Sequence, residues 1–441
     1  MKKAKICYYK LNNREVKKKL IYDTNERPPL GKWFILSLQH VFAMFGATIL
    51  VPILINESAG SEVITVPLAL VTSGIGTLIY IFFTKGKSPV YLGSSFAFIT
   101  SVVIAYKEGG ISAFTTGIIS VGIIYIIFAL LIKLFGKNWI DKLLPPIVVG
   151  PMIIIIGLSL APHAISQIGL TGENIAWQNI IVAFVSFFAT ALVAICAKGF
   201  LKVIPFLVGI FTGYIFAIML NMVNFAPIIE ASVFELPRFL IPFKDYSFSL
   251  TGLLTMAPLA LVSIAEHIGD HMALGNIIGK DLIKDPGLDR TLLGDGFASV
   301  AAGLVGGPAN TTYGENTSVV GMSKVASVWV TGLAAIIAIC MGFLGKVVAI
   351  FSSIPEPVLG GVSLLLYGFI SVNGLKVLTE NKIDFNNIRN VIIASTMLIL
   401  GLGGAVISFS SSNLSFSITG MSLAALIGIL FNLVLPEQVE E

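Results

Sequence analysis

The sequence predicts an all-α polytopic membrane protein, and three observations carry this prediction. Of the 441 residues, 56% are hydrophobic and only 12% are charged, whereas an ordinary soluble domain carries about 25% charged residues. Apolar runs long enough to cross a bilayer recur along the chain. The basic residues lie mostly in every second loop between these runs, as the positive-inside rule predicts for a membrane protein. The low charge, with a net value of only +4, argues against a soluble multidomain protein, a disordered chain, a coiled coil and a nucleic-acid-binding protein.

Twelve apolar segments are candidates for membrane-spanning helices. They are Trp33–Ile55, Val66–Thr84, Ser112–Leu134, Pro146–Leu160, Asn179–Lys198, Pro205–Val223, Thr251–Asn276, Arg290–Gly306, Val325–Phe343, Pro357–Val372, Asn387–Gly404 and Ile418–Leu435. Two further segments, Pro89–Tyr106 and Pro308–Ser323, are shorter and are broken by small and polar residues, and we expect each to carry a short extended stretch. With these two, the sequence predicts 14 transmembrane segments.

The distribution of lysine and arginine among the loops tests this number of spans, because cytoplasmic loops of membrane proteins are enriched in both residues. With the N-terminus inside, the tail and the inner loops hold 24 of the 28 basic residues. The outer loops hold four: Lys107, Arg238, Lys244 and Lys346. Ten basic residues lie between Lys2 and Lys32, and no apolar run precedes Trp33. We therefore expect no cleavable signal peptide, two cytoplasmic termini, and a basic tail that faces lipid head groups.

The two broken segments are the third and the tenth, so they hold the same place in two sets of seven. Both continue with two hydroxyl residues, an aromatic residue and a small residue, namely Ser94-Ser95-Phe96-Ala97 and Thr311-Thr312-Tyr313-Gly314. Because seven is odd, the second set has the inverted topology. Paired interruptions at corresponding positions are typical of the midplane site of a secondary transporter. The alternative is a chance likeness between helices rich in small residues that only pack closely.

Several polar residues lie inside the expected spans: Gln39, His40, Glu266, His267, Asp270, His271 and Glu315. Glu266 and Asp270 are four residues apart and share one helix face. Glu315 lies in the tenth segment, and we expect these three to be the acids inside the membrane. An acid at the bilayer centre costs at least about 2.5–3.5 kcal/mol, so its default interpretation is functional. The alternative is a structural pair for the acids, or a satisfied core histidine in the case of His40.

Other chemistries are less well supported by the sequence. His267 and His271 have the i, i+4 spacing of zinc-binding helices, with Glu315 as a possible third ligand. An intramembrane metallohydrolase is therefore a distant alternative. The three cysteines, Cys7, Cys196 and Cys340, are far apart and predict neither a disulfide framework nor a metal site. No glycine-rich run is followed by the Lys-Ser/Thr pair of a phosphate loop, so transport would be driven by a gradient.

Seven stretches, which lie nearly end to end along the chain, resemble the nucleobase–ascorbate transporter family, also called nucleobase:cation symporter-2. Within that family the chain is most similar to the bacterial uracil:proton symporters. The stretches are Glu26–Leu30 (ERPPL), Ser37–Pro52 (SLQHVFAMFGATILVP), Tyr91–Phe98 (YLGSSFAF), Ala265–His267 (AEH), Lys280–Gly287 (KDLIKDPG), Asn310–Asn316 (NTTYGEN) and Gly360–Gly368 (GGVSLLLYG).

The resemblance implies a fold of two inverted seven-helix repeats in a bacterial plasma membrane. Spans one to four (33–137) and eight to eleven (251–346) would form a core domain, and spans five to seven (138–225) and twelve to fourteen (347–435) a gate domain. Residues 1–32 and 436–441 would be cytoplasmic tails. Relatives of this kind are homodimeric transporters, not enzymes. They use an elevator-like movement of core against gate, with the proton as coupling ion and no cofactor.

The resemblance also assigns site residues. Glu266 and Glu315 would hold the base, with help from the backbone amides of Phe96 and Gly314. The pocket lining would include Ala47, Tyr313 and Tyr367. Proton coupling would involve Glu266, Asp270 and His267.

The residue chemistry agrees with a uracil site. Uracil is a flat, neutral ring edged with alternating N–H and C=O groups, so a carboxylate can accept from its N–H groups and a protonated carboxyl can donate to its C=O groups. The Phe96 ring offers a stacking face, and helix ends offer free amides.

Two departures from the family pattern are visible, at Asp270 and after the tenth-span motif, and Glu315 bears on the choice of substrate. Asp270 stands where uracil carriers usually have a histidine tied to proton coupling and where purine carriers more often have an acid, which keeps a xanthine or purine permease as the alternative. Glu315 stands where purine carriers usually have glutamine, which favours uracil. Ser318 and Ser323-Lys324 replace the usual residues after the tenth-span motif. An anion carrier of the same fold is disfavoured, because acids at the site would repel its substrate.

Overall fold

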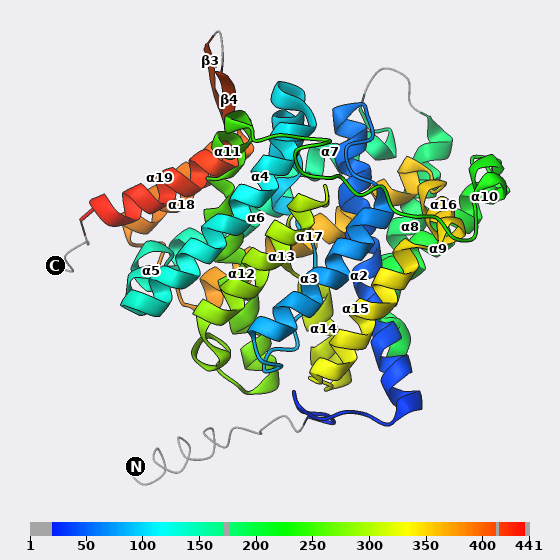
Figure 1. The fold of residues 1–441 in the computed structure, drawn as a ribbon, viewed down its shortest axis with the longest axis horizontal. Coiled ribbons are helices and arrows are strands. Elements are labelled where there is room, and N and C mark those ends of the chain that lie inside the picture. The colour runs from blue at the N-terminus through cyan, green and yellow to red at the C-terminus, as the bar shows by residue number, and fades with distance from the viewer. Residues whose placement is uncertain (1–19, 172–175, 412–413, 437–441) are drawn as a thin grey trace.

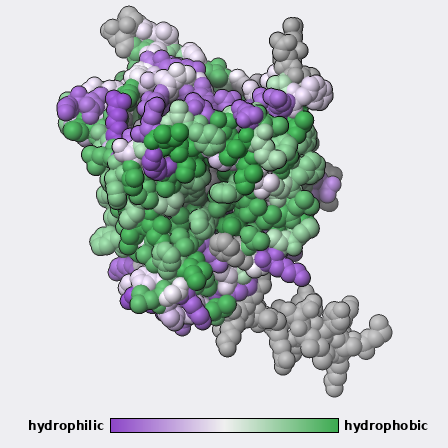
Figure 2. Space-filling view, turned by 90° about the vertical axis from the view of Figure 1, so that its right-hand side faces the viewer, coloured by the Kyte–Doolittle hydropathy of each residue, from purple (hydrophilic) through white to green (hydrophobic). Residues whose placement is uncertain are grey.

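The structure is a computed structural model, and it describes residues 20–171, 176–411 and 414–436. Most of the two expected tails, residues 1–19 and 437–441, lies outside the described residues. Helices form nearly the whole body and most of them run along one common direction (Figure 1). On the face shown in Figure 2, a broad apolar band crosses the middle of the molecule and polar residues gather towards its two ends. A bilayer would produce this distribution of polarity.

Among the described residues of the first half, the structure has eight α-helices and one short strand. They are α2 (Leu30–Ala59), α3 (Val66–Phe83), β1 (Leu92–Ser94), α4 (Ile99–Phe135), α5 (Asn138–Leu143), α6 (Pro146–Ser159), α7 (Ala161–Ile168), α8 (Trp177–Cys196) and α9 (Pro205–Met219). The short 3-10 turn η1 (Phe96–Phe98) leads into α4, and η2 (Gly199–Val203) leads into α9.

The second half repeats this arrangement in outline and adds a hairpin. Its elements are α10 (Ala226–Glu230), α11 (Leu250–Met256), α12 (Leu259–Ile278), α13 (Leu288–Leu304), β2 (Asn310–Thr312), α14 (Gly314–Ser323), α15 (Val328–Gly342), α16 (Gly345–Ser352), α17 (Glu356–Glu380), α18 (Ile388–Leu402), β3 (Val406–Ser411), β4 (Leu414–Thr419) and α19 (Gly420–Val434).

Every expected span contains a helix, but fewer helices meet the length of a complete crossing. In the described part of the chain, six helices are long and apolar enough to cross a membrane, or up to eight if two bent pairs each count as one span. The bent pairs are α11 with α12, at 44°, and α15 with α16, at 83°. The apolar helices α9, α18 and α19 are shorter. A helix of 15 residues rises only about 22 Å, less than the roughly 30 Å of a bilayer core.

The expected boundary between the third and fourth spans is a break inside one helix rather than a loop. Gly109 and Gly110 leave the helical conformation within α4, and Gly110 has a φ of 63°. Glycine adopts this left-handed conformation without a steric penalty. The chain therefore bends here and continues directly into the second part of α4.

The two broken segments pair with each other. β1 and β2 run antiparallel, with Leu92 opposite Thr312 and Ser94 opposite Asn310. This confirms the short extended stretches predicted from the sequence. All six strand residues are buried. Strands so short leave backbone groups unpaired along their outer edges, and at this depth no water is at hand to satisfy them.

Side chains from the flanking helices bond the outer edges of the two strands. On the β1 edge, the Ser73 hydroxyl donates to the Leu92 carbonyl at 2.6 Å, and the Leu92 N–H donates to Thr77 Oγ1 at 3.0 Å. On the β2 edge, the Asn310 N–H donates to Ser299 Oγ at 3.2 Å, and the Ser299 hydroxyl lies 3.1 Å from the Asn310 carbonyl. α3 and α13 thus complete the hydrogen bonding that lets extended backbone lie inside a helical body.

One element was not predicted from the sequence. β3 and β4 form an antiparallel hairpin that projects from one end of the molecule (Figure 1). The expectation of a purely helical protein is therefore incomplete. Serine alternates with apolar residues in Val406–Ser411 and Leu414–Thr419, which is the period-two pattern of a strand. The last span accordingly begins at Gly420, two residues after the predicted Ile418.

The helices pack in two groups. In the first group α4 packs on α13 and α11, α3 packs on α15 and α13, and α2 packs on α15. In the second group α17 packs on α6, α7, α8 and α9, while α18 packs on α19 and α6. The groups meet where α12 contacts α6 and α19 and where α2 contacts α9.

Loops that the basic-residue pattern assigns to one side contact one another. Lys280 Nζ lies 2.5 Å from Asp23 Oδ1, and Lys87 Nζ lies 2.6 Å from Asp285 Oδ1. At the other end, Lys346 Nζ donates to the Ile228 carbonyl at 2.7 Å. These contacts support the predicted grouping of loops, because each joins segments expected on the same side.

Glycine permits a close helix crossing in the first group. A Cβ atom added at Gly296 of α13 would lie 2.8 Å from the Gly122 carbonyl oxygen of α4, whereas one added at Gly368 of α17 would meet nothing within 4 Å. We predict that Gly296→Ala destabilises the protein by about 1–3 kcal/mol through overpacking. Gly368→Ala should be neutral or slightly stabilising. Thermal unfolding of both variants in detergent measures the difference, and equal midpoints would contradict this account of the crossing.

Candidate functional site

The paired strands bring two helix beginnings to the same place in the molecule. β1 leads into η1 and α4, and β2 leads into α14. The Ser95 N–H donates to the Ala309 carbonyl at 3.0 Å, and the Tyr313 N–H donates to the Tyr91 carbonyl at 3.1 Å. No side chain caps the first turn of η1 or of α14. The free N–H groups at such helix ends attract hydrogen-bond acceptors.

The three acids predicted from the sequence come together beside these helix ends. Glu266 and Asp270 lie one turn apart on α12, and Glu315 lies in the first turn of α14. The Glu266 carboxyl group interacts electrostatically with those of Asp270 and Glu315. Asp270 accepts a hydrogen bond of 2.5 Å from the Thr312 hydroxyl of β2, whereas Glu266 Oε2 is buried without a partner.

Aromatic residues occupy the space around the two strands. The Tyr313 hydroxyl donates to the Ser94 carbonyl at 3.0 Å and accepts from the Thr48 hydroxyl of α2 at 3.2 Å. The rings of Phe96 and Tyr367 meet edge to face, with 6.1 Å between their centroids. Phe96, Tyr313 and Tyr367 are all buried; Phe96 contacts Tyr367 of α17, and Tyr313 contacts α2 and β1.

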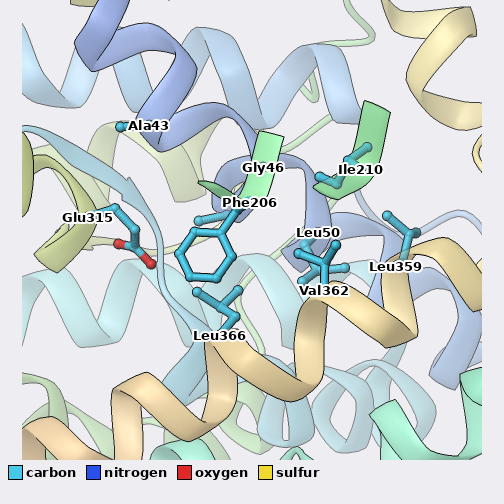
Figure 3. Close-up of a pocket in the computed structure, with 10 residues that line it drawn as sticks. Ala43, Gly46, Leu50, Phe206, Ile210, Glu315, Leu359, Val362 and Leu366 are labelled. Atoms are coloured by element: carbon cyan, nitrogen blue, oxygen red, sulfur yellow. The ribbon is translucent and has the colours of Figure 1, made fainter. Parts of the chain in front are cut away.

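A small cavity of about 10 Å³ lies between the two helix groups. Two predicted residues, Ala47 and Glu315, are in its wall. The other wall residues are Ala43, Gly46, Leu50, Phe206, Ile210, Leu359, Val362 and Leu366 (Figure 3). The cavity has room for about one water molecule, so the site is closed in this conformation. Phe96, Gly314, Tyr313, Tyr367 and Glu266 are not in the wall of this cavity.

Several buried polar atoms around the strands have no hydrogen-bond partner. They include Ser94 Oγ, Ser95 Oγ, Thr311 Oγ1, Glu266 Oε2 and the Tyr367 hydroxyl. A buried polar group without a partner costs about 1–3 kcal/mol, and native proteins contain few of them. Their concentration beside two uncapped helix ends is typical of a site that a polar ligand completes.

The two histidines of α12 face away from these acids. His267 Nδ1 lies 2.7 Å from Asp295 Oδ2 and His267 Nε2 lies 2.9 Å from Thr291 Oγ1, both on α13. His271 Nε2 lies 2.5 Å from the Tyr80 hydroxyl of α3. Glu315 lies with the acids, on the side of α12 away from these histidine contacts. His267, His271 and Glu315 therefore do not form the zinc site that the spacing suggested. Among the residues that the structure describes, no group of three or more His, Cys, Asp or Glu side chains could hold a metal.

Asp295 corrects the prediction that Glu266, Asp270 and Glu315 are the acids inside the spans. It lies in α13, within the expected span Arg290–Gly306, and its side chain is 0% exposed. Its Oδ1 atom has no partner. The same rule that singled out the other acids would have found it, because any acid inside an apolar span calls for an explanation.

His40 has the structural role that the sequence left open. The Asn316 amide nitrogen of α14 lies 3.1 Å from both His40 Nδ1 and the His40 carbonyl oxygen. His40 is 2% exposed. It therefore serves as a satisfied core residue that fastens α2 to α14, next to Glu315.

Comparison with known proteins gives the chain its family. A sequence model of a permease family matches residues 31–408. The chain belongs to this permease family. The resemblance to nucleobase:cation symporter-2 is confirmed, and the chain is thus a transporter rather than an enzyme.

Individual relatives extend over nearly the full length of this permease. It is 47% identical to the uracil permease of Bacillus subtilis (strain 168), covering 96% of this chain and 97% of that one. It is 46% identical to the uracil permease of Bacillus caldolyticus, covering 95% of both chains. Among solved structures, the murine solute carrier 26 anion transporter A9 in its inward-facing state superposes with a TM-score of 0.67 at 10% identity, covering 97% of this chain and 74% of that one. That likeness concerns the fold alone.

A second hollow of about 840 Å³ opens at the end of the permease opposite the Asp23–Lys280 contact. Four of its lining residues are the acids Glu57, Glu62, Glu235 and Glu356, against one arginine, Arg238. It begins about one helical turn from the small cavity, since Leu50 lines one and Ile53 the other along α2.

A polar contact joins the two helix groups beside this hollow. Glu57 of α2 accepts from the Gln167 amide of α7 at 3.1 Å, and its Oε2 atom lies 3.1 Å from His163 Nε2. α2 belongs to the first group and α7 to the second. This contact therefore holds the groups together at the end of the molecule where the hollow opens.

Gly93 provides a test of the strand and aromatic arrangement. A Cβ atom at this position of β1 would overlap the Tyr313 ring. We predict that Gly93→Ala lowers the stability of the permease by about 1–3 kcal/mol, because Tyr313 must leave its bonds to Ser94 and Thr48. In a Tyr313→Ala background the same substitution should cost much less. Thermal unfolding of the four proteins gives the coupling energy, and simple additivity would show that Gly93 and Tyr313 do not constrain each other.

Proposed function

We propose that this permease imports uracil together with protons. The observation that carries the proposal is the set of buried, unpartnered hydrogen-bonding groups between two uncapped helix ends, bounded by Glu266 and Glu315. The full-length similarity to two uracil permeases supports the choice of uracil.

The site has the groups that a neutral, flat, polar ring requires. The carboxylates of Glu266 and Glu315 accept hydrogen bonds from ring N–H groups, and the backbone amides at Phe96 and Gly314 donate to ring C=O groups. The Phe96 ring supplies a stacking surface. The backbone of Gly314 is not covered by a neighbouring side chain, since an added Cβ would meet only the Asn373 amide nitrogen, 4.0 Å away.

Proton coupling follows from placing carboxyl groups where substrate binds. The Glu266 carboxyl group lies at the proposed ligand site. It is also close enough to the carboxyl groups of Asp270 and Asp295 to interact with them electrostatically. A carboxyl that takes up a proton changes from an acceptor to a donor and loses its charge, so base binding and protonation affect each other at one place. Asp270 carries the second exchangeable proton group, and His267, bonded to Asp295, links this face of α12 to α13.

We propose an elevator-like movement of the first helix group, the core (33–137 and 251–346), against the second, the gate (138–225 and 347–435). The wall of the small cavity is divided between them: α2 and α14 of the core hold Ala47 and Glu315, and α9 and α17 of the gate supply the facing apolar residues. Displacement of one group along the other would open the closed cavity without unfolding the broken segments.

The same proposal includes the remaining topology. Fourteen crossings in two inverted sets of seven place both termini in the cytoplasm of a bacterial cell, under the inner membrane. We also propose a homodimer.

A xanthine or purine carrier is the second candidate, favoured by Asp270. The acid-lined hollow argues against an anion substrate, although the solved relative transports anions.

Uptake of labelled uracil tests the proposed function directly. We expect cells that lack their own uracil uptake to accumulate uracil when they produce this permease, and a protonophore to abolish the accumulation. Unlabelled uracil should compete more strongly than xanthine. Accumulation that persists with the protonophore would remove the coupling, and competition by xanthine but not uracil would select the purine alternative.

Glu266→Gln tests the acid at the centre of the site. The amide cannot replace a charged acceptor, and loss of a hydrogen bond to a charged group costs about 1.5–3 kcal/mol, so uracil affinity should fall at least about tenfold. Glu380→Gln changes an exposed acid at the end of α17 and should leave binding unchanged. Binding of uracil to the purified proteins measures both, and wild-type affinity in Glu266→Gln would exclude Glu266 from the site.

A further inference from the structure

The small cavity has one aromatic side chain in its wall. Phe206, the second residue of α9, comes from the gate side. In the view of Figure 3 its ring lies in the middle of the group, between the Glu315 carboxyl group and the side chains of Leu50 and Val362. The largest side chain of the wall thus stands opposite a polar group that we assign to substrate.

The position of this ring is well defined. Pro205 opens α9 and fixes the direction in which the helix starts. The Phe206 ring contacts that of Phe369 on α17, edge to face, with 5.8 Å between centroids. It also packs against the buried cluster that contains Ile210 and Val362. An aromatic ring held on these sides forms a fixed wall and does not swing freely.

The α2 side of the wall nearest Glu315 is made of small residues. α2 presents Ala43, Gly46 and Ala47 there, and a Cβ atom at Gly46 would lie 3.4 Å from Ile210 Cδ1. The fourth α2 residue of the wall, Leu50, lies beyond the Phe206 ring from Glu315 in the view of Figure 3. The large side chain closest to Glu315 in this view is therefore Phe206, on the gate side.

Hydrogen bonding at the acids does not distinguish uracil from xanthine. The six-membered ring of xanthine repeats the alternating N–H and C=O edge of uracil, and a five-membered ring is fused to it. Glu266 and Glu315 can accept from either base. Selection between them has to come from the space available to the second ring, because an isosteric polar edge gives no discrimination.

We infer that Phe206 sets the size limit of the substrate and selects single-ring over fused-ring bases. This inference rests on the proposed function, since it needs a base to bind beside Glu315. It makes Phe206 a specificity-determining residue that supplies no hydrogen bond. The rival interpretation is that Phe206 only closes the cavity, in which case its removal would change the rate of transport but not the choice of substrate.

A graded series of variants separates these interpretations. Phe206→Leu and Phe206→Ala enlarge the site in two steps. Phe211→Ala is the matched control, because it removes the same side chain from the same helix at a position that is 63% exposed and outside the cavity wall. The measurements are uptake of labelled uracil, its inhibition by unlabelled xanthine, and direct uptake of labelled xanthine, each at equal amounts of protein in the membrane.

The expected result is a shift in substrate range. The xanthine concentration for half-inhibition should fall at least about tenfold in Phe206→Ala, the scale on which apolar pockets discriminate by size. Phe206→Leu should lie between, and Phe211→Ala should match the wild type. If Phe206→Ala loses uptake altogether, two other measurements decide between the interpretations. These are the inhibition of uracil uptake by xanthine in Phe206→Leu and the binding of xanthine to the purified variants.

Two results would overturn the inference. One is continued exclusion of xanthine by both Phe206 variants while uracil uptake persists. The other is equal inhibition by uracil and xanthine in the wild type, which would show that no size limit exists. Failure of the proposed function gives a different signature, namely no uracil uptake by the wild type.

Discussion

The antiparallel pairing of β1 with β2 is the contact on which the rest of the site depends. Extended backbone inside an apolar body is stable only if its N–H and C=O groups are bonded. The two strands bond each other across the middle, and serine and threonine side chains of α3 and α13 bond their outer edges. Without these bonds the chain would continue as helix, and neither α4 nor α14 would begin at the centre of the molecule.

The acids and the aromatic residues take their places from that pairing. Thr312 of β2 holds Asp270, and Tyr313, the next residue, bonds across to the Ser94 carbonyl of β1. Glu315 follows in the first turn of α14. The proposed recognition groups therefore lie on elements that are fixed to one another, whereas the second helix group contributes only apolar side chains to the cavity wall. Polar binding and closure of the site are in this way assigned to different helix groups.

The helical membrane fold and the two broken segments were predictable from the sequence, because low charge, the length of the apolar runs and the paired interruptions each have a direct physical cause. The cost of burying an acid marked Glu266 and Glu315 as residues that need an explanation, and the family resemblance implied that the two act at one site. Phe206 was not predictable, because an apolar residue in an apolar helix carries no sequence signal. The pairing of Val406–Ser411 with Leu414–Thr419 was not predicted, because its period-two pattern is short and lies between two apolar spans. Asp295 was overlooked although its signal was present.

The acid-lined hollow has a consequence for what reaches the site at all. Four carboxyl groups face one guanidinium group around an open volume of about 840 Å³, so the local potential is negative. A free base is uncharged and crosses this region without electrostatic work. A phosphorylated base derivative carries negative charge, and this potential opposes its approach. For the uracil site proposed above, the hollow would therefore favour access of free bases over that of nucleotides.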